Sequence, residues 1–384
     1  MMIKGRRVLK RHILLIGVFV LTSLTPGYPP AQTIHRGNAH TVLSFPRDHR
    51  MHQDDPLMKQ HYMEWLYFTG ILQDEASGAA WGYEITLWQA IIPVLNKEKP
   101  LFAYDIALSD LQHSRHYAYR MVPVRLGPKR LGEIRQEGNT WIYEDPGGLT
   151  IRHQETADIW QLAFTSTATN DQADQPPVQI AVKLVSGKSD YYTHTPDGLI
   201  PSGTCTLNRD TLDGYTYYYT NPALTTTATF TIDRQTITLR GDTWFDHQWG
   251  NFNHCLLKWN WFSLRLDDGR YLMVFQFVDN QGNPLPDRLS LSYIDPARDQ
   301  QQFWTGSDSL TLTPLRTWTD AVSRLRFPLT WELITPVGTF GIEPAFDDQM
   351  MPPLPKPYWE GVIVVRQGGV DGSRIGSGYL EVAR

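Results

Sequence analysis

The chain has 384 residues, which is enough for two domains of ordinary size, and its formal net charge is −5. The first 31 residues carry five Lys and Arg residues and no acid, so the remainder carries a net charge of −10. A chain that acidic is a poor non-specific binder of nucleic acids and anionic membranes, so we do not expect a nucleic-acid-binding protein.

The N-terminus has the pattern of an export signal. A basic stretch is followed by an apolar run at residues 13–24 and then by Pro- and Gly-rich sequence. This run is shorter than the roughly 20 residues that a membrane-spanning helix needs, so residues 1–31 are predicted to be a signal peptide. The pair Arg6-Arg7 leaves both the Sec and the twin-arginine routes open. We therefore expect an exported protein of the periplasm, the cell envelope or the medium.

The rest of the chain has the composition and patterning of strands. Aromatic residues make up 12% of the sequence, and 29 Gly and 26 Pro provide turns between the apolar runs. Alternating or β-branched runs occur at residues 81–89, 178–185, 225–239, 271–277, 310–313 and 360–366. No amphipathic helix longer than about three turns is predicted. Many short strands indicate an all-β sandwich or barrel, and a barrel of eight or more strands has room for a small ligand.

An internal repeat divides these strands into two groups. Residues 65–74 (WLYFTGILQD) match residues 259–268 (WNWFSLRLDD) at Trp, Phe, Leu and the final Asp. An Asp-His pair precedes each copy, at residues 48–49 and 246–247, and a turn and an alternating strand follow it. The shared order predicts a duplication. We expect a first domain at residues 38–235 and a second at residues 236–384.

The densest group of chemically active side chains lies at residues 241–250 (GDTWFDHQWG). In a strand, Trp244 and Asp246 share one face, and His247 and Trp249 share the other. Two interpretations stay open. In the first, the cluster is structural, and an acid accepts a hydrogen bond from a buried indole. In the second, the cluster belongs to a functional site.

Two other patterns carry less information. His49 and His52 have the spacing of metal ligands, but no third ligand is close in the sequence, so no metal site is predicted. Cys205 and Cys255 are the two cysteines of the chain. An oxidising compartment would permit a disulfide between them, and two buried thiols are the alternative.

Several segments together resemble the carotenoid 1,2-hydratase/AttH family. They are residues 64–70 (EWLYFTG), 217–219 (YYY), 244–250 (WFDHQWG), 259–262 (WNWF), 266–269 (LDDG), 358–361 (YWEG) and 376–381 (GSGYLE). The resemblance covers essentially everything after residue 40. It implies two tandem lipocalin-like antiparallel barrels with few short helices. The chain departs from the family pattern at Gln248, which replaces a Glu, and in residues 271–277, which contain Gln276 and no acid.

The resemblance implies a hydratase-like activity on an apolar, isoprenoid-like substrate, either water addition or cyclisation. Water adds to an isolated alkene only after protonation, so such a site needs a protonated acid, aromatic faces for the cation and a polar group that orients water. Four catalytic residues are expected: Asp246 as the acid, Trp249 as a ring that faces the cation, and His247 or Tyr67 as the group that positions water. The substrate-binding residues are expected to be Glu64, Trp65, Trp244, Trp261 and Gln276. Neither a metal nor a cofactor is predicted.

Two further function classes remain open. A binding protein could carry an isoprenoid or another lipid in the cell envelope without catalysis, since a fold alone does not establish activity. A sugar-binding protein or glycosidase would instead need an open cleft, and a glycosidase would also need two carboxylates. Whether the protein is a hydratase or a lipid-binding protein, its partner is expected to be an apolar small molecule. Peripheral contact with a membrane is left open, and a monomer is expected.

Overall fold

The computed structural model describes residues 32–34, 43–52, 62–91, 100–121, 132–166, 175–202, 214–251, 258–306, 308–352 and 357–384. The predicted signal peptide and both cysteines lie outside these residues. Within the described part, no helix has the length and apolarity needed to cross a membrane.

The first of two antiparallel sheets contains 13 strands in the described part of the chain, in the order β5-β4-β3-β2-β14-β13-β10-β9-β8-β7-β6, with β11 and β12 also paired to β13. Its strands are β2 (Tyr62–Asp74), β3 (Ala80–Ile91), β4 (Leu101–Asp110), β5 (Arg115–Met121), β6 (Glu133–Glu137), β7 (Thr140–Glu144), β8 (Leu149–Gln154), β9 (Ile159–Thr165), β10 (Val178–Val185), β11 (Tyr192–Thr193), β12 (Leu199–Pro201), β13 (Tyr215–Ile232) and β14 (Gln235–Asn251).

The second sheet contains 10 strands among the described residues, in the order β1-β18-β17-β16-β15-β23-β22-β21-β20-β19. They are β1 (Gln32–Ile34), β15 (Lys258–Leu266), β16 (Tyr271–Val278), β17 (Pro284–Asp295), β18 (Gln300–Thr305), β19 (Thr311–Thr319), β20 (Arg326–Thr335), β21 (Gly338–Pro344), β22 (Tyr358–Gln367) and β23 (Arg374–Ala383). Two short 3-10 helices, η1 (Arg47–His49) and η2 (Pro296–Arg298), complete the described elements.

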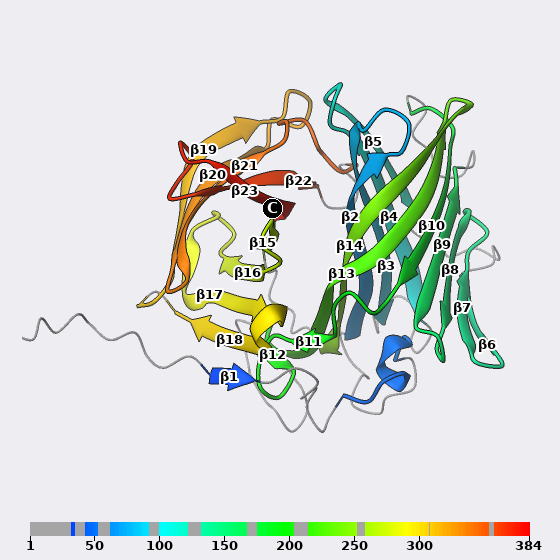
Figure 1. Cartoon of the computed structure of the whole chain (residues 1–384), viewed down its shortest axis with the longest axis horizontal. Coiled ribbons are helices and arrows are strands. Elements are labelled where there is room, and N and C mark those ends of the chain that lie inside the picture. The colour runs from blue at the N-terminus through cyan, green and yellow to red at the C-terminus, as the bar shows by residue number, and fades with distance from the viewer. Residues whose placement is uncertain are drawn as a thin grey trace, which may run out of the picture.

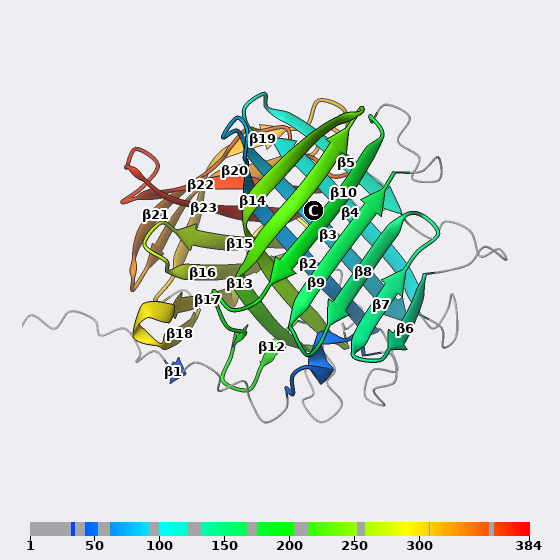
Figure 2. The same cartoon turned by 45° about the vertical axis from the view of Figure 1, so that its right-hand side comes forward.

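The two sheets curl separately and lie side by side (Figure 1), and the view of Figure 2 brings the long strands of the first sheet to the front. This arrangement confirms the all-β class and the two lipocalin-like units. The two copies of the repeat lie along β2 and β15, and each strand pairs with the strand that follows it.

The chain passes from the first sheet to the second between β14 and β15. The domain boundary expected at residue 235 falls at the turn between β13 and β14, and both of these strands belong to the first sheet. The first 16 residues of the expected second domain therefore lie between β2 and β13 in the first sheet. Conversely, the N-terminal strand β1 belongs to the second sheet, where it pairs with β18.

Strand alternation divides the apolar side chains among three cores. In β2, the side chains of Leu66 and Phe68 lie on the inner face of the first sheet and belong to its core. Phe262 and Leu264 of β15 do the same in the second sheet. A third cluster, which includes Tyr67 and the outward-facing residues of both sheets, lies between the sheets. The outer faces of the central strands are therefore buried as well, and β16 is buried along its whole length.

The sheets approach each other most closely where β3 meets β22 and β23. A Cβ atom on Gly82 would collide with Val362 and with the Tyr379 hydroxyl, so the close approach requires glycine at this position. The same Tyr379 hydroxyl donates a hydrogen bond to the Tyr83 carbonyl oxygen at 3.0 Å. These contacts fix the distance between the two outer faces.

Residues 43–52, which include η1, lie at one end of the first sheet (Figure 1) and are held there by a buried charged network. His52 Nδ1 and His247 Nε2 each lie 2.8 Å from Glu64 Oε1, and His52 Nε2 lies 3.1 Å from Asp48 Oδ1. The His52 ring stacks on Trp249 with centroids 4.1 Å apart. Since an ionised acid and an imidazolium stabilise each other here, the network ties the N-terminal segment to β2 and β14.

The pKa values of this network follow from burial and pairing. Burial alone would raise the pKa of Glu64, but the neighbouring His52 and His247 outweigh it and lower the pKa to about 2. Burial would lower the pKa of His52, and the carboxylates of Glu64 and Asp48 instead raise it to about 9. Both groups are therefore charged at neutral pH.

We expect Glu64→Gln to lower the free energy of unfolding by about 3 kcal/mol near pH 7, because it removes one of the two carboxylates that pair with a buried imidazolium. The His52 contribution is fully present below its unfolded pKa and is lost as the pH rises through about 9. The Glu64 contribution is present above the unfolded pKa and is lost as the pH falls toward about 2. Urea unfolding at pH 7 and pH 10 measures the His52 contribution, and unfolding at pH 3 and pH 7 measures the Glu64 contribution.

The matched control is Glu133→Gln, the same change on an exposed residue of β6, which we expect to change stability by less than about 0.5 kcal/mol. The difference between wild type and Glu64→Gln should shrink at pH 10. Equal stability of the two proteins at pH 7 would show that the network does not hold the segment.

Candidate functional site

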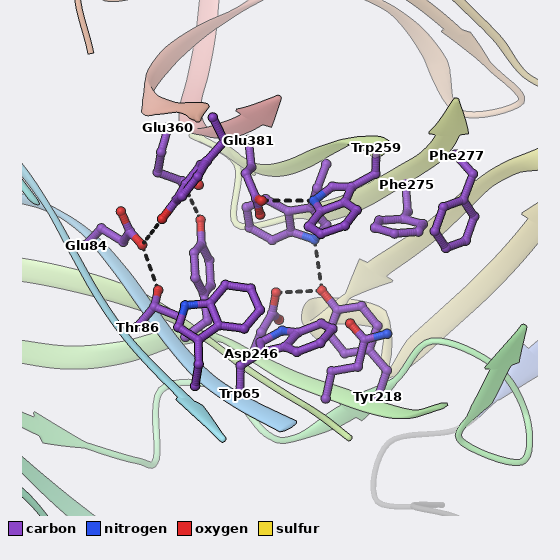
Figure 3. A pocket seen from close by; sticks show the side chains of 15 residues that line it. Trp65, Glu84, Thr86, Tyr218, Asp246, Trp259, Phe275, Phe277, Glu360 and Glu381 are labelled. Atoms are coloured by element: carbon purple, nitrogen blue, oxygen red, sulfur yellow. Dashed lines mark hydrogen bonds between the residues drawn. The ribbon is translucent and has the colours of Figure 1, made fainter. Parts of the chain in front are cut away.

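A narrow cavity lies between the outer faces of the two sheets (Figure 3) and has a volume of about 50 Å³. The first sheet contributes Trp65, Tyr67, Glu84, Thr86, Trp88, Tyr218, Asp246 and Gln248 to its wall, and the second contributes Trp259, Trp261, Phe275, Phe277, Tyr358, Glu360 and Glu381. The lining therefore combines aromatic rings with four carboxyl groups.

The internal repeat accounts for the opposed walls of the cavity. Trp65 and Tyr67 of β2 occupy the same positions in the repeat as Trp259 and Trp261 of β15. Because side chains two residues apart in a strand share a face, each pair points outward from its own sheet. The two copies thus meet across the cavity, and the Tyr67 and Trp261 rings lie edge to face at 5.1 Å.

Asp246 lies at the base of the cavity with both carboxyl oxygens bonded. Trp244 Nε1 donates to Oδ1 at 2.7 Å, and the Tyr218 hydroxyl donates to Oδ2 at 2.6 Å. Trp261 Nε1 in turn donates to the Tyr218 hydroxyl oxygen at 2.8 Å, which links this group to the second sheet. Burial raises the pKa of Asp246 to about 7, against the effect of hydrogen bonds from Tyr218 and Trp244.

Glu360 and Glu84 differ from Asp246 because each has one carboxyl oxygen without a hydrogen-bond partner in the described part of the chain. The other oxygen of Glu360 accepts from the Tyr67 hydroxyl, and that of Glu84 accepts from the Thr86 hydroxyl at 2.7 Å. Burial raises the pKa of both glutamates well above the usual range, and their proximity to other carboxyl groups raises it further. Both groups therefore favour the protonated form.

The strand register explains why these acids influence one another. Glu360 of β22 lies directly opposite Glu381 of β23, on the same face of the sheet. Trp259 Nε1 donates to Glu381 Oε1 at 2.9 Å. Two ionised carboxylates at adjacent positions, away from water, would repel strongly, so at least one must hold its proton.

One buried cation lies behind this group of acids. Arg120 Nε lies 2.5 Å from Asp105 Oδ1, and the guanidinium lies 5.1 Å from the centroid of the Tyr358 ring. The Tyr358 hydroxyl donates to Asp105 Oδ2 at 2.7 Å. The arginine is thus paired with Asp105, which does not line the cavity, and it fixes Tyr358 in the wall.

The structure brings together four of the residues expected from the sequence. Asp246, Tyr67, Trp65 and Trp261 line the cavity. Trp244 does not line it, but its indole holds Asp246 in place.

The other four expected residues lie elsewhere. Glu64, His247 and Trp249 point to the opposite face of the first sheet, where they form the network with His52. Gln276 is also outside the lining and accepts a hydrogen bond from Asn260 Nδ2 at 3.0 Å. The cause is strand alternation: His247 and Trp249 are one residue out of phase with Asp246, and Gln276 is out of phase with Phe275 and Phe277.

Sequence reasoning missed Glu84, Tyr218, Glu360 and Glu381. Each lies in a segment that had been singled out, since Tyr218, Glu360 and Glu381 belong to the family-like motifs and Glu84 to an alternating strand. A charged residue inside an otherwise apolar strand is the signal that could have identified the three glutamates. Their convergence depends on contacts such as that of Tyr67 with Glu360, which are 293 residues apart.

His49 and His52 belong to two different clusters rather than to one metal site. His52 groups with Glu64 and His247, and His49 with His153 and Asp158, and in each group the candidate ligand atoms lie within 4.8 Å of one another. In each group, the further candidate ligands come from residues that are not close to the first histidine in the sequence. In the His52 group the same atoms already lie within hydrogen-bonding distance of one another.

Comparison with known proteins places this architecture in a family. The sequence model of the AttH-like family matches residues 36–383. A curated kievitone hydratase of Fusarium solani subsp. phaseoli is 26% identical over 115 residues, which are 28% of this chain and 30% of that protein's length. The matched segment therefore spans less than a third of that relative.

Two crystal structures share the fold over most of the chain. A Nitrosomonas europaea protein described as AttH has a TM-score of 0.70 and 22% identity, with 89% of this chain and 96% of that chain covered. Kievitone hydratase from Nectria haematococca has a TM-score of 0.58 and 17% identity, with 85% and 91% covered. Together with the match over residues 36–383, they confirm the resemblance seen in the motifs: the chain belongs to the AttH-like family.

Proposed function

We propose that this protein is a hydratase that adds water to a carbon–carbon double bond of an apolar, isoprenoid-like substrate by acid catalysis. The observation that carries the proposal is a pair of buried carboxyl groups, Glu360 and Asp246, in one aromatic cavity. Family membership and the similarity to a curated kievitone hydratase also support it.

Glu360 is the better candidate for the proton donor. Burial raises its pKa well above the usual range, which favours the protonated form, and one of its oxygens has no partner in the described part of the chain. The sequence pattern assigned this role to Asp246, but both oxygens of Asp246 already accept hydrogen bonds. Burial raises the pKa of both groups, that of Asp246 to about 7 and that of Glu360 well above its usual range.

The reaction then proceeds in two steps. Glu360 gives its proton to one alkene carbon and leaves a cation on the other, which the faces of neighbouring aromatic rings stabilise. Water attacks the cation, and its proton passes to ionised Asp246. Exchange with solvent returns the proton to Glu360, so the net change is the addition of one water molecule.

The size of the cavity limits what enters it. One water needs about 10–15 Å³ of such space, so about 50 Å³ holds a few waters or the reacting end of a substrate. A cavity of this kind protects a cation from bulk water, which suits hydration at a single double bond.

Location and partners are part of the same proposal. The basic and apolar residues at 1–31 support export, and an exported hydratase would act on a substrate of the cell envelope. The apolar character of such a substrate brings the protein close to a membrane surface. A monomer is sufficient for this function, because both walls of the cavity come from one chain.

The activity test is incubation of the full-length protein with lycopene or neurosporene, with mass spectrometry to detect the gain of one water. We expect a product from the wild type and a rate at least about 100-fold lower for Glu360→Gln and for Asp246→Asn, since each removes one proton-transfer group. The control is Glu133→Gln, which should retain full activity.

If no variant differs from the wild type, or if the wild type forms no product yet binds these compounds saturably, the hydratase proposal fails for them. The second outcome would favour the non-catalytic lipid carrier.

The pH profile distinguishes the two assignments of the acid. With Asp246 as the base, kcat/KM should rise as the pH increases through about 7, because the carboxylate form is required. It should fall only at the higher pH where Glu360 ionises. If Asp246 is instead the acid, kcat/KM should fall through pH 7. Initial rates between pH 5 and pH 10 measure this, and circular dichroism over the same range controls for unfolding.

A further inference from the structure

A second, larger cavity adjoins the first and has a volume of about 400 Å³. Phe275 and Phe277 of β16 line both cavities, so the two spaces share one aromatic wall. The rest of the second cavity is formed by β17 and β18 of the second sheet and by the segment between β11 and β12 of the first. We call this space the distal chamber.

His194 is a buried polar side chain that lacks a partner and lines the distal chamber. It is 6% exposed, and neither ring nitrogen has a hydrogen-bond partner in the described part of the chain. Burial lowers its pKa to about 3, so the ring is neutral at physiological pH. A neutral imidazole offers one donor and one acceptor, and leaving both unpaired is unfavourable.

Ser309 provides a second, independent observation of the same kind. Ser309 is 4% exposed and lines the distal chamber, and its hydroxyl has no partner among the described residues. Buried polar groups in proteins are normally satisfied by protein, water or a ligand. Two such groups in one cavity indicate that the cavity is built to receive an oxygen-bearing molecule.

The distal chamber is also connected to the proposed reaction site through contacts between side chains. The His194 ring lies 4.3 Å from the ring of Tyr218, and the Tyr218 hydroxyl donates to Asp246. Apolar side chains such as Ile200, Met273 and Trp304 make up much of the remaining wall. An elongated molecule could therefore extend from one cavity to the other along Phe275 and Phe277.

We propose that the distal chamber binds the apolar body of the ligand and that His194 binds a hydroxyl group on it. The ligand class is an isoprenoid alcohol or a similarly elongated, hydroxylated apolar molecule. The inference rests on the proposed function in placing the reacting end in the smaller cavity. The hydroxyl recognition itself requires no catalysis and is tested by binding alone.

The experiment compares farnesol with β-farnesene, its hydrocarbon counterpart, by displacement of the fluorescent dye N-phenyl-1-naphthylamine from the full-length protein. We expect the wild type to prefer farnesol. In His194→Leu the affinity for farnesol should fall about 3- to 10-fold, the effect of one lost hydrogen bond, while the affinity for β-farnesene is unchanged. The matched control is His113→Leu, because the His113 side chain is 57% exposed and lies outside both linings.

Two further variants keep the test decisive. His194→Asn retains a donor and an acceptor and should preserve part of the preference for farnesol. Ser290→Trp adds a large side chain to the chamber wall and should abolish the binding of both compounds. Equal weakening of the two compounds in His194→Leu, or no effect on either, would overturn the proposal.

Failure of the hydratase proposal is separable from this result. A selective loss of farnesol in His194→Leu, together with no hydration by the wild type, would leave the chamber assignment intact and remove the catalytic one. Hydration without any preference for farnesol would do the reverse.

Discussion

The packing of one sheet's outer face against that of the other is the constraint on which the rest of the structure depends. A lipocalin-like sheet normally keeps its core inside and its outer face in water, with polar residues outward. Here the outer faces of β2, β3 and β14 are covered by β15, β16, β22 and β23. Any acid on these faces is therefore removed from water, and its chemistry changes.

The same residue type consequently has opposite roles on the two faces of one sheet. Glu64 points inward, lies beside two histidines and is ionised, with a pKa of about 2. Glu84 points outward, lies among other acids and favours its protonated form, because burial raises its pKa well above the usual range. The first arrangement holds the N-terminal segment in place, and the second favours protonated carboxyl groups in an aromatic cavity.

The duplication explains how such a cavity can arise in one chain. Each unit contributes an equivalent pair of aromatic residues, Trp65 with Tyr67 and Trp259 with Trp261, and the acids occupy strands on either side. The lack of an acid in residues 271–277 does not leave the second unit without one, because Glu360 and Glu381 reach the cavity from β22 and β23. The larger chamber beside it extends the space available to a ligand.

The sequence by itself determined the all-β class, the duplication and the family, because alternation, turns and short motifs are local properties. It also placed Asp246 and His247 on opposite faces, and it identified the aromatic residues that line the cavity at Trp65 and Trp261. Only the tertiary structure decided which face lines the cavity and which acids share it. Tyr67 and Glu360 meet across 293 residues, and His247 joins Glu64 across 183. Neither contact has a local signature, since both depend on which strands pair and on how two finished sheets pack together.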